Sequence, residues 1–156
     1  MRYCTAAEAV KLIRSNDSVY IQGSTSSPEV LVAAMADRGT ELSGVKVYSA
    51  FAVGAFDAPF CRPEYRESFL VNSLFVANNI RRWLADGYGQ TIPAFLGEIP
   101  GLFRDGTLPV DVALVNVSPP DAEGYCSFGV SADLAVSAVE GAKMVIATGS
   151  KAMPYS

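Results

Sequence analysis

The sequence predicts an α/β fold, in which an open, mostly parallel β-sheet carries helices on both faces. Segments rich in β-forming apolar residues alternate with segments of helical periodicity, roughly every 25–35 residues. The segment DVALVNV at 111–117 is apolar almost throughout, as expected of a strand that is covered on both faces. A chain of 156 residues is the size of one domain, so we expect residues 1–156 to form a single core.

The first fifty residues contain two helix–strand steps. Thr5 and Glu8 have the spacing of a capping box, and apolar residues then recur at helical spacing. Pro28 suits the first turn of a second helix, for which Ser27 would supply the N-cap. The predicted elements are, in order, a helix at 6–15, a strand at 18–22, a helix at 28–38 and a strand at 45–50.

The middle of the chain is less regular. Residues 51–68 contain glycine and prolines without a sustained period, which is typical of a long loop with one helical turn. Asn78 or Asn79 can cap a helix that Gly87 ends, and Pro93 restricts the strand around it to a sheet edge. The predicted elements are a strand at 69–75, a helix at 77–87, a strand at 91–95 and a short helix or pair of turns at 97–106.

The last third contains the strand at 111–117, a helix that Ser131 would cap and that runs to about residue 140, and a final strand at 142–148. In a parallel sheet the carboxyl ends of the strands form the ligand crevice. The loop QGSTSSPE at 22–29 and the loop at 118–129 both follow strands at that edge. They are therefore the candidate ligand loops.

These two loops are open to two interpretations. Gly23 permits close backbone approach, and the neighbouring serines offer hydroxyls that could hold a phosphate or a carboxylate. The same residues also fit ordinary loop chemistry, in which serines cap helices, Pro119 and Pro120 end a strand, and Gly124 turns the chain. Residue types alone leave both interpretations open.

The composition excludes several classes of function. The chain has no histidine, so neither a Ser–His nor a Cys–His catalytic pair can form within it. Its three cysteines, Cys4, Cys61 and Cys126, are widely spaced and form no CxxC, which argues against a disulfide framework and a zinc site. The net charge is −4 and the basic residues are scattered apart from Arg81–Arg82, so we expect no nucleic-acid partner.

The hydropathy of the sequence predicts where the protein is located and whether it associates with another domain or chain. No window reaches the roughly 18 consecutive apolar residues of a membrane span, and the first residues, MRYCTAAEAVKLIRSND, form an amphipathic pattern rather than a signal peptide. We therefore expect a cytoplasmic protein with no membrane partner. Half of the residues are apolar, which favours a face that packs against another domain or chain, and we expect a homo-oligomer.

Several segments together resemble one family. VSPPDAEGYCSFGVS at 117–131 closely resembles the signature segment of the acetyl-CoA hydrolase/transferase family, which includes 4-hydroxybutyrate and succinate or acetate CoA-transferases. VYIQGSTSSPEVLVAAM resembles the first strand, loop and helix of the family, and ESFLVNSLFVANNIRRWLADG resembles its FRxNSLFVxxNxRxxVxxG segment. The run from Pro93 to Ala147 is similar, nearly in register, to its core FxSEIPxLFRxGxLPxDVALxxVSPPDxxGYCSxGVSxD. The resemblance covers almost the whole chain.

The resemblance implies a class I CoA-transferase-like fold of two similar α/β halves, with residues 1–156 as the amino-terminal CoA-transferase domain. In that family a glutamate carboxylate attacks the acyl-CoA thioester, and a glutamyl-CoA thioester then hands CoA to a second carboxylic acid. Family members place this glutamate in the carboxy-terminal half, which we expect to be absent from this chain. The resemblance therefore implies no catalytic residue here, an inactive chain by itself, and coenzyme A as substrate with no other cofactor.

The implied partners are the carboxy-terminal half, an acyl-CoA and a short-chain carboxylate. In a two-half enzyme the cleft lies between the halves, so the loops at 22–29, 78–82 and 118–129 are expected to line it. An arginine can hold a carboxylate through two parallel hydrogen bonds, although Arg82 also fits a solvated helix position. The candidate substrate-binding residues are Gln22, Gly23, Ser24, Asn78, Asn79, Arg82, Ser118, Pro119, Pro120, Gly124, Tyr125 and Ser127.

Other assignments are possible. A stand-alone, non-catalytic domain that binds acyl-CoA or carboxylates would bind its ligand without a partner. A sugar-phosphate isomerase or deaminase of similar architecture is disfavoured, because such sites usually need a histidine or clustered acids. We expect Cys126 to be a packed residue rather than a nucleophile, because no histidine or neighbouring cation would lower the pKa of its thiol. Glu98 fits a carboxylate favoured at a helix start.

Overall fold

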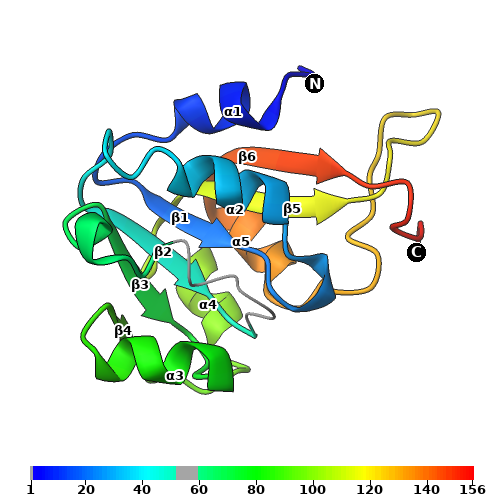
Figure 1. The fold of residues 1–156 in the computed structure, drawn as a ribbon. Coiled ribbons are helices and arrows are strands. Elements are labelled where there is room, and N and C mark those ends of the chain that lie inside the picture. Colours follow the sequence, from blue (N-terminus) through cyan, green and yellow to red (C-terminus); the bar gives the residue numbers. More distant parts are fainter. Residues whose placement is uncertain (1, 52–59) are drawn as a thin grey trace.

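A computed structural model describes residues 2–51 and 60–156 of the chain (Figure 1). Within these residues six strands form one sheet in the order β4-β3-β2-β1-β5-β6, and every neighbouring pair is parallel. The α/β prediction is confirmed. The strands are β1 (Ser18–Ile21), β2 (Val45–Ser49), β3 (Phe69–Ser73), β4 (Gly89–Thr91), β5 (Val110–Val117) and β6 (Ala142–Gly149).

Helices cover both faces of this sheet (Figure 1). One face packs against α1 (Ala6–Ala9), α2 (Glu29–Ala36) and α3 (Asn78–Ala85), whose apolar residues join those of the strands in the larger core cluster. The other face packs against α4 (Ile99–Arg104) and α5 (Ala135–Gly141), where Phe103 meets the ring of Tyr20 edge-on at 5.5 Å. Short 3-10 turns lie at Val10–Leu12, Ser24–Ser26 and Pro63–Tyr65.

The central strands are buried because both of their faces are covered. All four residues of β1 are buried, and six of the eight residues of β5 are. This matches the apolar composition from which these strands were predicted. The edge strand β6 differs, since only Ile146 among its eight residues is buried. No helix among the described residues has the length and apolar character needed to cross a bilayer.

Local chemistry sets some element boundaries as predicted. Thr5 and Glu8 form the capping box, in which Thr5 Oγ1 accepts from the Glu8 amide and Glu8 accepts from the Thr5 amide. The helix that follows is shorter than predicted, since it tightens into a 3-10 turn at Val10. β4 ends at Thr91, before Pro93, because proline has no amide to donate to a strand ladder; the predicted strand at 91–95 is therefore misplaced.

The helix starts were predicted less well. The N-cap positions of α2, α3 and α5 are Pro28, Ala77 and Leu134, and none makes a side-chain capping bond. Ser131 makes other contacts, since its carbonyl accepts from Gln22 and its hydroxyl lies 3.3 Å from Thr25 Oγ1, and α5 begins after it, at Ala135. The caps predicted at Ser27, Asn78, Asn79 and Ser131 are therefore wrong. Part of the predicted loop at 51–68, residues 52–59, lies outside the described residues.

Candidate functional site

The site begins with the position of β1 in the sheet. From β1 the chain proceeds to β2, β3 and β4 on one side, whereas β5 and β6 lie on the other side. The strand order therefore reverses between β1 and β5, and in open α/β sheets the ligand crevice lies at such a switch point, outside the carboxyl ends of the strands. Two loops leave the sheet there: the β1 loop (residues 22–28) and the β5 loop (residues 118–129).

Gln22 ties these neighbouring segments together. Its side chain is fully buried; Oε1 accepts from the amide of Asn116 at 2.7 Å, and Nε2 donates to the carbonyl of Ser131 at 2.7 Å. The Gln22 amide also donates to the carbonyl of Leu114 at 3.0 Å. Both ends of the carboxamide are thus bonded to backbone on either side of the β5 loop. Gln22 was predicted to contact substrate. It lies at the site, and its buried side chain holds the backbone on both sides of the β5 loop in place.

The β1 loop approaches the end of β2 closely. A Cβ atom on Gly23 would lie only 1.9 Å from the carbonyl oxygen of Ala50, so this position requires glycine. The next residue, Ser24, has a φ of 56° and donates its amide to the carbonyl of Phe51, whose own φ is 53°. Non-glycine residues in this left-handed region cost of order 1–3 kcal/mol each. The described carboxyl edge therefore holds two strained residues in direct contact.

Two serine hydroxyls of the β1 loop are buried and unbonded. Ser26 Oγ and Ser27 Oγ have no hydrogen-bond partner among the described residues. A buried hydroxyl without a partner costs about 1–3 kcal/mol, and structures rarely retain such a group without a reason. Ser27 lines the groove described below, so its hydroxyl is a donor that a ligand oxygen could satisfy, whereas Ser26 is fully buried and does not line it.

The β5 loop is closed at its base by two serines. The Ser118 amide donates to the Ser127 carbonyl at 2.9 Å, and the Ser127 amide donates to Ser118 Oγ at 2.9 Å. Ser127 Oγ in turn accepts from the Gly129 amide at 2.9 Å. Both serines are buried, whereas Pro119, Pro120, Gly124 and Tyr125 are exposed on the part of the loop that stands away from the sheet (Figure 1).

Asp121 organises the exposed part of the β5 loop. Its Oδ1 accepts from the amides of Glu123 and Tyr125, each at 2.9 Å, and its Oδ2 accepts from the hydroxyl of Tyr155 at 2.8 Å. These bonds stabilise the charged carboxylate, so the Tyr155 hydroxyl first and the backbone amides next hold the pKa of Asp121 below its usual value. The same hydrogen bond raises the pKa of Tyr155.

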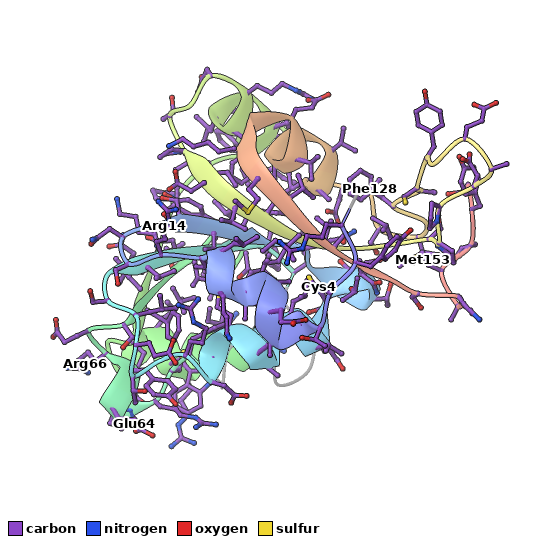
Figure 2. All side chains as sticks on the ribbon, turned by 90° about the horizontal axis from the view of Figure 1, so that it is seen from above. Cys4, Arg14, Glu64, Arg66, Phe128 and Met153 are labelled. Atoms are coloured by element: carbon purple, nitrogen blue, oxygen red, sulfur yellow. The ribbon has the colours of Figure 1, made fainter. Side chains whose placement is uncertain are left out.

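The segment after β6, residues 150–156, lies against the β5 loop. Ser127 Oγ donates to the Ser156 carbonyl at 2.8 Å, and the side chain of Met153 is buried beside Gly129, where an added Cβ would lie 2.2 Å from Met153 Sδ. Figure 2 shows Met153 and Phe128 on these two adjoining segments. The 150–156 segment therefore fixes the position of the β5 loop.

A groove of about 1500 Å³ runs along this side of the molecule. The β1 loop lines it with Ser24 and Ser27, and the β5 loop lines it with Ser118, Pro120 and Cys126. The groove continues over β6 and the residues around α1. The structure thus brings two of the three predicted loops to one cavity. Cys126 is partly exposed there and is less fully packed than the sequence suggested.

Sequence reasoning missed two polar residues of this groove. Asn116 and Thr148 are register partners on β5 and β6, and Thr148 Oγ1 lies 3.3 Å from Asn116 Oδ1. Both line the groove. A signal was available, because each is a polar residue that follows the apolar middle of its strand, near the carboxyl end where a ligand crevice is expected.

The third predicted loop is not part of this cavity. Asn78 and Arg82 belong to α3, which follows β3, and two strands separate β3 from β5. The Arg82 side chain is 82% exposed, lies 3.7 Å from a carboxylate oxygen of Asp86, and covers the ring of Trp83 at 5.8 Å. These contacts fit a solvated helix position. The side chain of Asn79 lies outside what the structure describes.

Comparison with known proteins identifies the family. The family model described as "Acetyl-CoA hydrolase/transferase N-terminal domain" matches residues 1–156. Among curated relatives, a 4-hydroxybutyrate coenzyme A transferase of Clostridium kluyveri is 37% identical over 96% of this chain and 34% of its own length. A butyryl-CoA:acetate CoA-transferase of Anaerostipes caccae is 30% identical over 96% of this chain and 33% of its own length.

Solved structures agree with this match. RipA from Yersinia pestis superposes with a TM-score of 0.87 at 27% identity, over 97% of this chain and 37% of that one. A 4-hydroxybutyrate CoA-transferase from Porphyromonas gingivalis gives a TM-score of 0.78 at 33% identity, over 97% and 34%. The chain spans about a third of the length of these relatives. Its fold, its β5 loop and these matches together show that the chain belongs to the acetyl-CoA hydrolase/transferase family, as the N-terminal domain.

Proposed function

We propose that residues 1–156 form one wall of the active-site crevice of a CoA-transferase that moves CoA between a short-chain acyl-CoA, such as acetyl-CoA, and a carboxylate. One observation carries the proposal: the β1 loop and the β5 loop converge at the switch point between β1 and β5, joined by the buried Gln22. The identity of 30–37% to CoA-transferases over 96% of the chain supports it.

The reaction proceeds through covalent glutamyl intermediates. The carboxylate of a glutamate attacks the thioester carbonyl, and the CoA thiolate leaves as a mixed anhydride forms. The thiolate then attacks the glutamyl carbonyl, which releases the first carboxylate and leaves a glutamyl-CoA thioester. The acceptor carboxylate takes CoA by the reverse of these two steps. No electron or hydride moves, so the chemistry requires no redox cofactor. We place the glutamate in a carboxy-terminal half outside residues 1–156.

We infer that this chain binds and orients the acyl group and the carboxylate. The buried hydroxyl of Ser27 lacks a partner among the described residues, and Ser24, Ser27 and Ser118 line the groove. Hydrogen-bond donors that are already in place before the reaction stabilise the negative charge that develops on oxygen atoms in the transition state. We infer that the β1 and β5 loops hold the acyl group and the carboxylate while the glutamate attacks from the opposite wall. A cytoplasmic location and self-association stay predictions.

The test is CoA exchange between acetyl-CoA and a set of short carboxylic acids. It is measured with residues 1–156 alone and with the full-length product of the gene. We expect the full-length protein to exchange CoA and to yield a glutamyl adduct that hydroxylamine or borohydride traps. We expect residues 1–156 to exchange none, because the reacting carboxylate is not among them.

Other outcomes would favour other functions. CoA exchange by residues 1–156 alone at the rate of an enzyme would refute the proposal that the reacting glutamate lies outside these residues. Binding of acetyl-CoA by residues 1–156, combined with a full-length protein that neither exchanges nor hydrolyses it, would instead indicate the non-catalytic binding domain. Release of free CoA to water without any acceptor acid would identify a hydrolase.

A further inference from the structure

Two neighbouring segments form one wall of the groove, and we call them together the clasp. The clasp consists of the β5 loop, residues 118–129, and of the segment after β6, residues 150–156. Both segments lie beyond the carboxyl ends of their strands (Figure 1). The residues that line the groove are Ser118, Pro120 and Cys126 from the β5 loop and Ser150 and Lys151 from the other segment. Because the clasp lies outside the sheet, its own contacts must fix the position of this wall.

The base of the clasp is held at several points. Ser127 Oγ donates to the carbonyl of Ser156 at 2.8 Å, and the Ser156 amide donates to Ser127 Oγ at 3.2 Å. Ser156 Oγ donates to the carbonyl of Gly129 at 3.2 Å, and the buried side chain of Met153 packs against that glycine. The loss of any one of these contacts leaves the others, so the base keeps its position.

The outer part of the clasp is a closed turn at residues 121–125. The Asp121 amide donates to the Tyr125 carbonyl at 2.8 Å, and the Gly124 amide donates to the Asp121 carbonyl at 3.1 Å. All five residues are exposed, so burial of apolar surface contributes little to the position of the turn. Among the described hydrogen bonds, only the 2.8 Å bond from the Tyr155 hydroxyl to Asp121 Oδ2 joins this turn to the other segment of the clasp. The turn is therefore ordered by its own bonds but depends on Tyr155 for its position.

We propose that Tyr155 is a positioning residue for CoA transfer, which acts through Asp121 to hold the turn at 121–125 beside the groove. The inference rests on the proposed function, because the substrates are those of that reaction. Without the Tyr155 hydroxyl, the turn also occupies positions in which this wall of the groove is incomplete, and a substrate must then order the turn when it binds. The apparent affinity for substrate falls in proportion to the fraction of molecules in the binding-competent state. The chemical step is unchanged, because the turn is ordered once substrate is bound and the reacting glutamate lies elsewhere.

Steady-state kinetics of the full-length protein test this role. We expect Tyr155→Phe to raise the KM for acetyl-CoA and for the acceptor acid by about three- to tenfold, the loss expected for one hydrogen bond, and to leave kcat within about twofold. The control is Tyr88→Phe beside β4, at the opposite edge of the sheet, where the ring packs against Trp83 and Arg66. It should change neither constant. An unchanged KM in Tyr155→Phe would overturn the proposal, and so would a loss confined to kcat.

A double-mutant cycle shows whether Tyr155 acts through Asp121. Asp121→Ala should itself raise KM, because it removes the acceptor of the Tyr155 hydrogen bond. Adding Tyr155→Phe to Asp121→Ala should then raise KM by less than about 1.5-fold, since the two side chains share one interaction. The same multiplicative effect of Tyr155→Phe in both backgrounds would refute the coupling between the two residues.

The dissociation constant of acetyl-CoA, measured by calorimetry on the full-length protein, separates this inference from the proposed function. We expect Tyr155→Phe to raise that constant by the same factor as KM. If the full-length protein binds acetyl-CoA but exchanges CoA with no acid, the proposed function is refuted, and the dissociation constants of the original protein and of Tyr155→Phe still decide the role of Tyr155. If the protein is active and the two constants are equal, only the positioning role is refuted. A full-length protein that binds no acetyl-CoA refutes both.

Discussion

The hydroxyl of Tyr155 donates a 2.8 Å hydrogen bond to Oδ2 of Asp121, and this bond fastens the 150–156 segment to the β5 loop. The two residues are 34 positions apart in sequence and both are solvent-exposed. Asp121 uses its other carboxylate oxygen to hold two amides of its own loop. One side chain therefore links the internal order of the β5 loop to the segment that follows β6.

The order of the β5 loop should depend on pH. The pKa of Asp121 is lowered, so its contribution is present above the ordinary aspartate range and is lost as the pH falls through the folded-state pKa. The pKa of Tyr155 is raised, so its contribution is present below about pH 10 and is lost as the pH rises through the folded-state value. We expect the protection of the Glu123 and Tyr125 amides, measured as their exchange rates relative to an unstructured chain at the same pH, to be greatest between these limits.

Tyr155→Phe should abolish the loss of β5-loop protection at high pH, because no phenol then ionises. It should also raise the pKa of Asp121 toward its usual value, because the Tyr155 hydroxyl is the largest contact that stabilises the Asp121 carboxylate. An NMR titration of the Asp121 carboxyl group measures this shift. Tyr3→Phe, which removes a hydroxyl from another exposed tyrosine, is the control. An unchanged pKa of Asp121 in Tyr155→Phe would contradict the role assigned to this contact.

Gln22→Leu should destabilise the protein. The substitution leaves the Asn116 amide and the Ser131 carbonyl without their partner, and each buried unpaired group costs about 1–3 kcal/mol. Urea unfolding of Gln22→Leu and of a second variant measures the loss in free energy of unfolding. The comparison variant is Gln90→Leu, since the exposed Gln90 bonds only one side chain in the described hydrogen bonds, the buried Asn72; one group rather than two then loses its partner, so its effect should be about half as large. Equal effects of the two substitutions would refute the bridging role of Gln22.

Gly23→Ala should disrupt the β1 loop, because the new methyl group would overlap the backbone carbonyl of Ala50 and neither backbone can move aside cheaply. We expect a lower melting temperature and, in the full-length protein, loss of CoA exchange. Gly101→Ala is the control, since a Cβ at this helical position meets nothing within 4 Å. Alanine should there stabilise the helix by about 0.5–1 kcal/mol. Full activity in Gly23→Ala would show that the close approach is dispensable.

Lys143→Met should make the protein more sensitive to acid. Burial pushes the pKa of Asp111 upward, but hydrogen bonds from Lys143 and from the Ser18 amide outweigh it and hold that pKa below its usual value. The carboxylate therefore stabilises the fold above the ordinary aspartate range, and this contribution is lost as the pH falls. Without Lys143 the loss should begin at higher pH, whereas at pH 7 the cost should be small, because solvent screens this exposed ammonium group.

Urea unfolding of Lys143→Met at pH 7 and near pH 4 checks this expectation. Lys151→Met removes the same charge at another exposed position and serves as the control. The prediction fails when both variants lose stability equally on acidification.

Cys126→Ser should leave CoA exchange by the full-length protein within about threefold of the original rate, since a hydroxyl of similar size can occupy the same place in the β5 loop. The reacting group in the proposed mechanism is a carboxylate rather than a thiolate. Steady-state kinetics with acetyl-CoA measure the rate. A loss of several orders of magnitude, together with labelling of Cys126 by an acyl-CoA, would identify the thiol as the nucleophile.

The order of the elements could be predicted from sequence because it depends on local patterns. The apolar run of β5, the capping box at Thr5 and Glu8, and the proline that excludes a strand beyond Thr91 each act over a few residues. The alternation of strands and helices then requires a parallel sheet, which places the β1 and β5 loops at the same edge. The composition of the two loops, rich in serine and glycine, marked them as candidates before their positions were known.

Only the tertiary structure decided which candidates lie together. No local pattern states that β1 lies between β2 and β5, and this order is what joins the β1 loop to the β5 loop and leaves Arg82 on a distant helix. It also brings the Ser131 carbonyl to Gln22, across 109 positions of sequence, and the Ser131 hydroxyl to Thr25 rather than to a helix start. The physical reason is that strand pairing and burial are satisfied over the whole sheet at once, whereas propensities and caps act within a few residues.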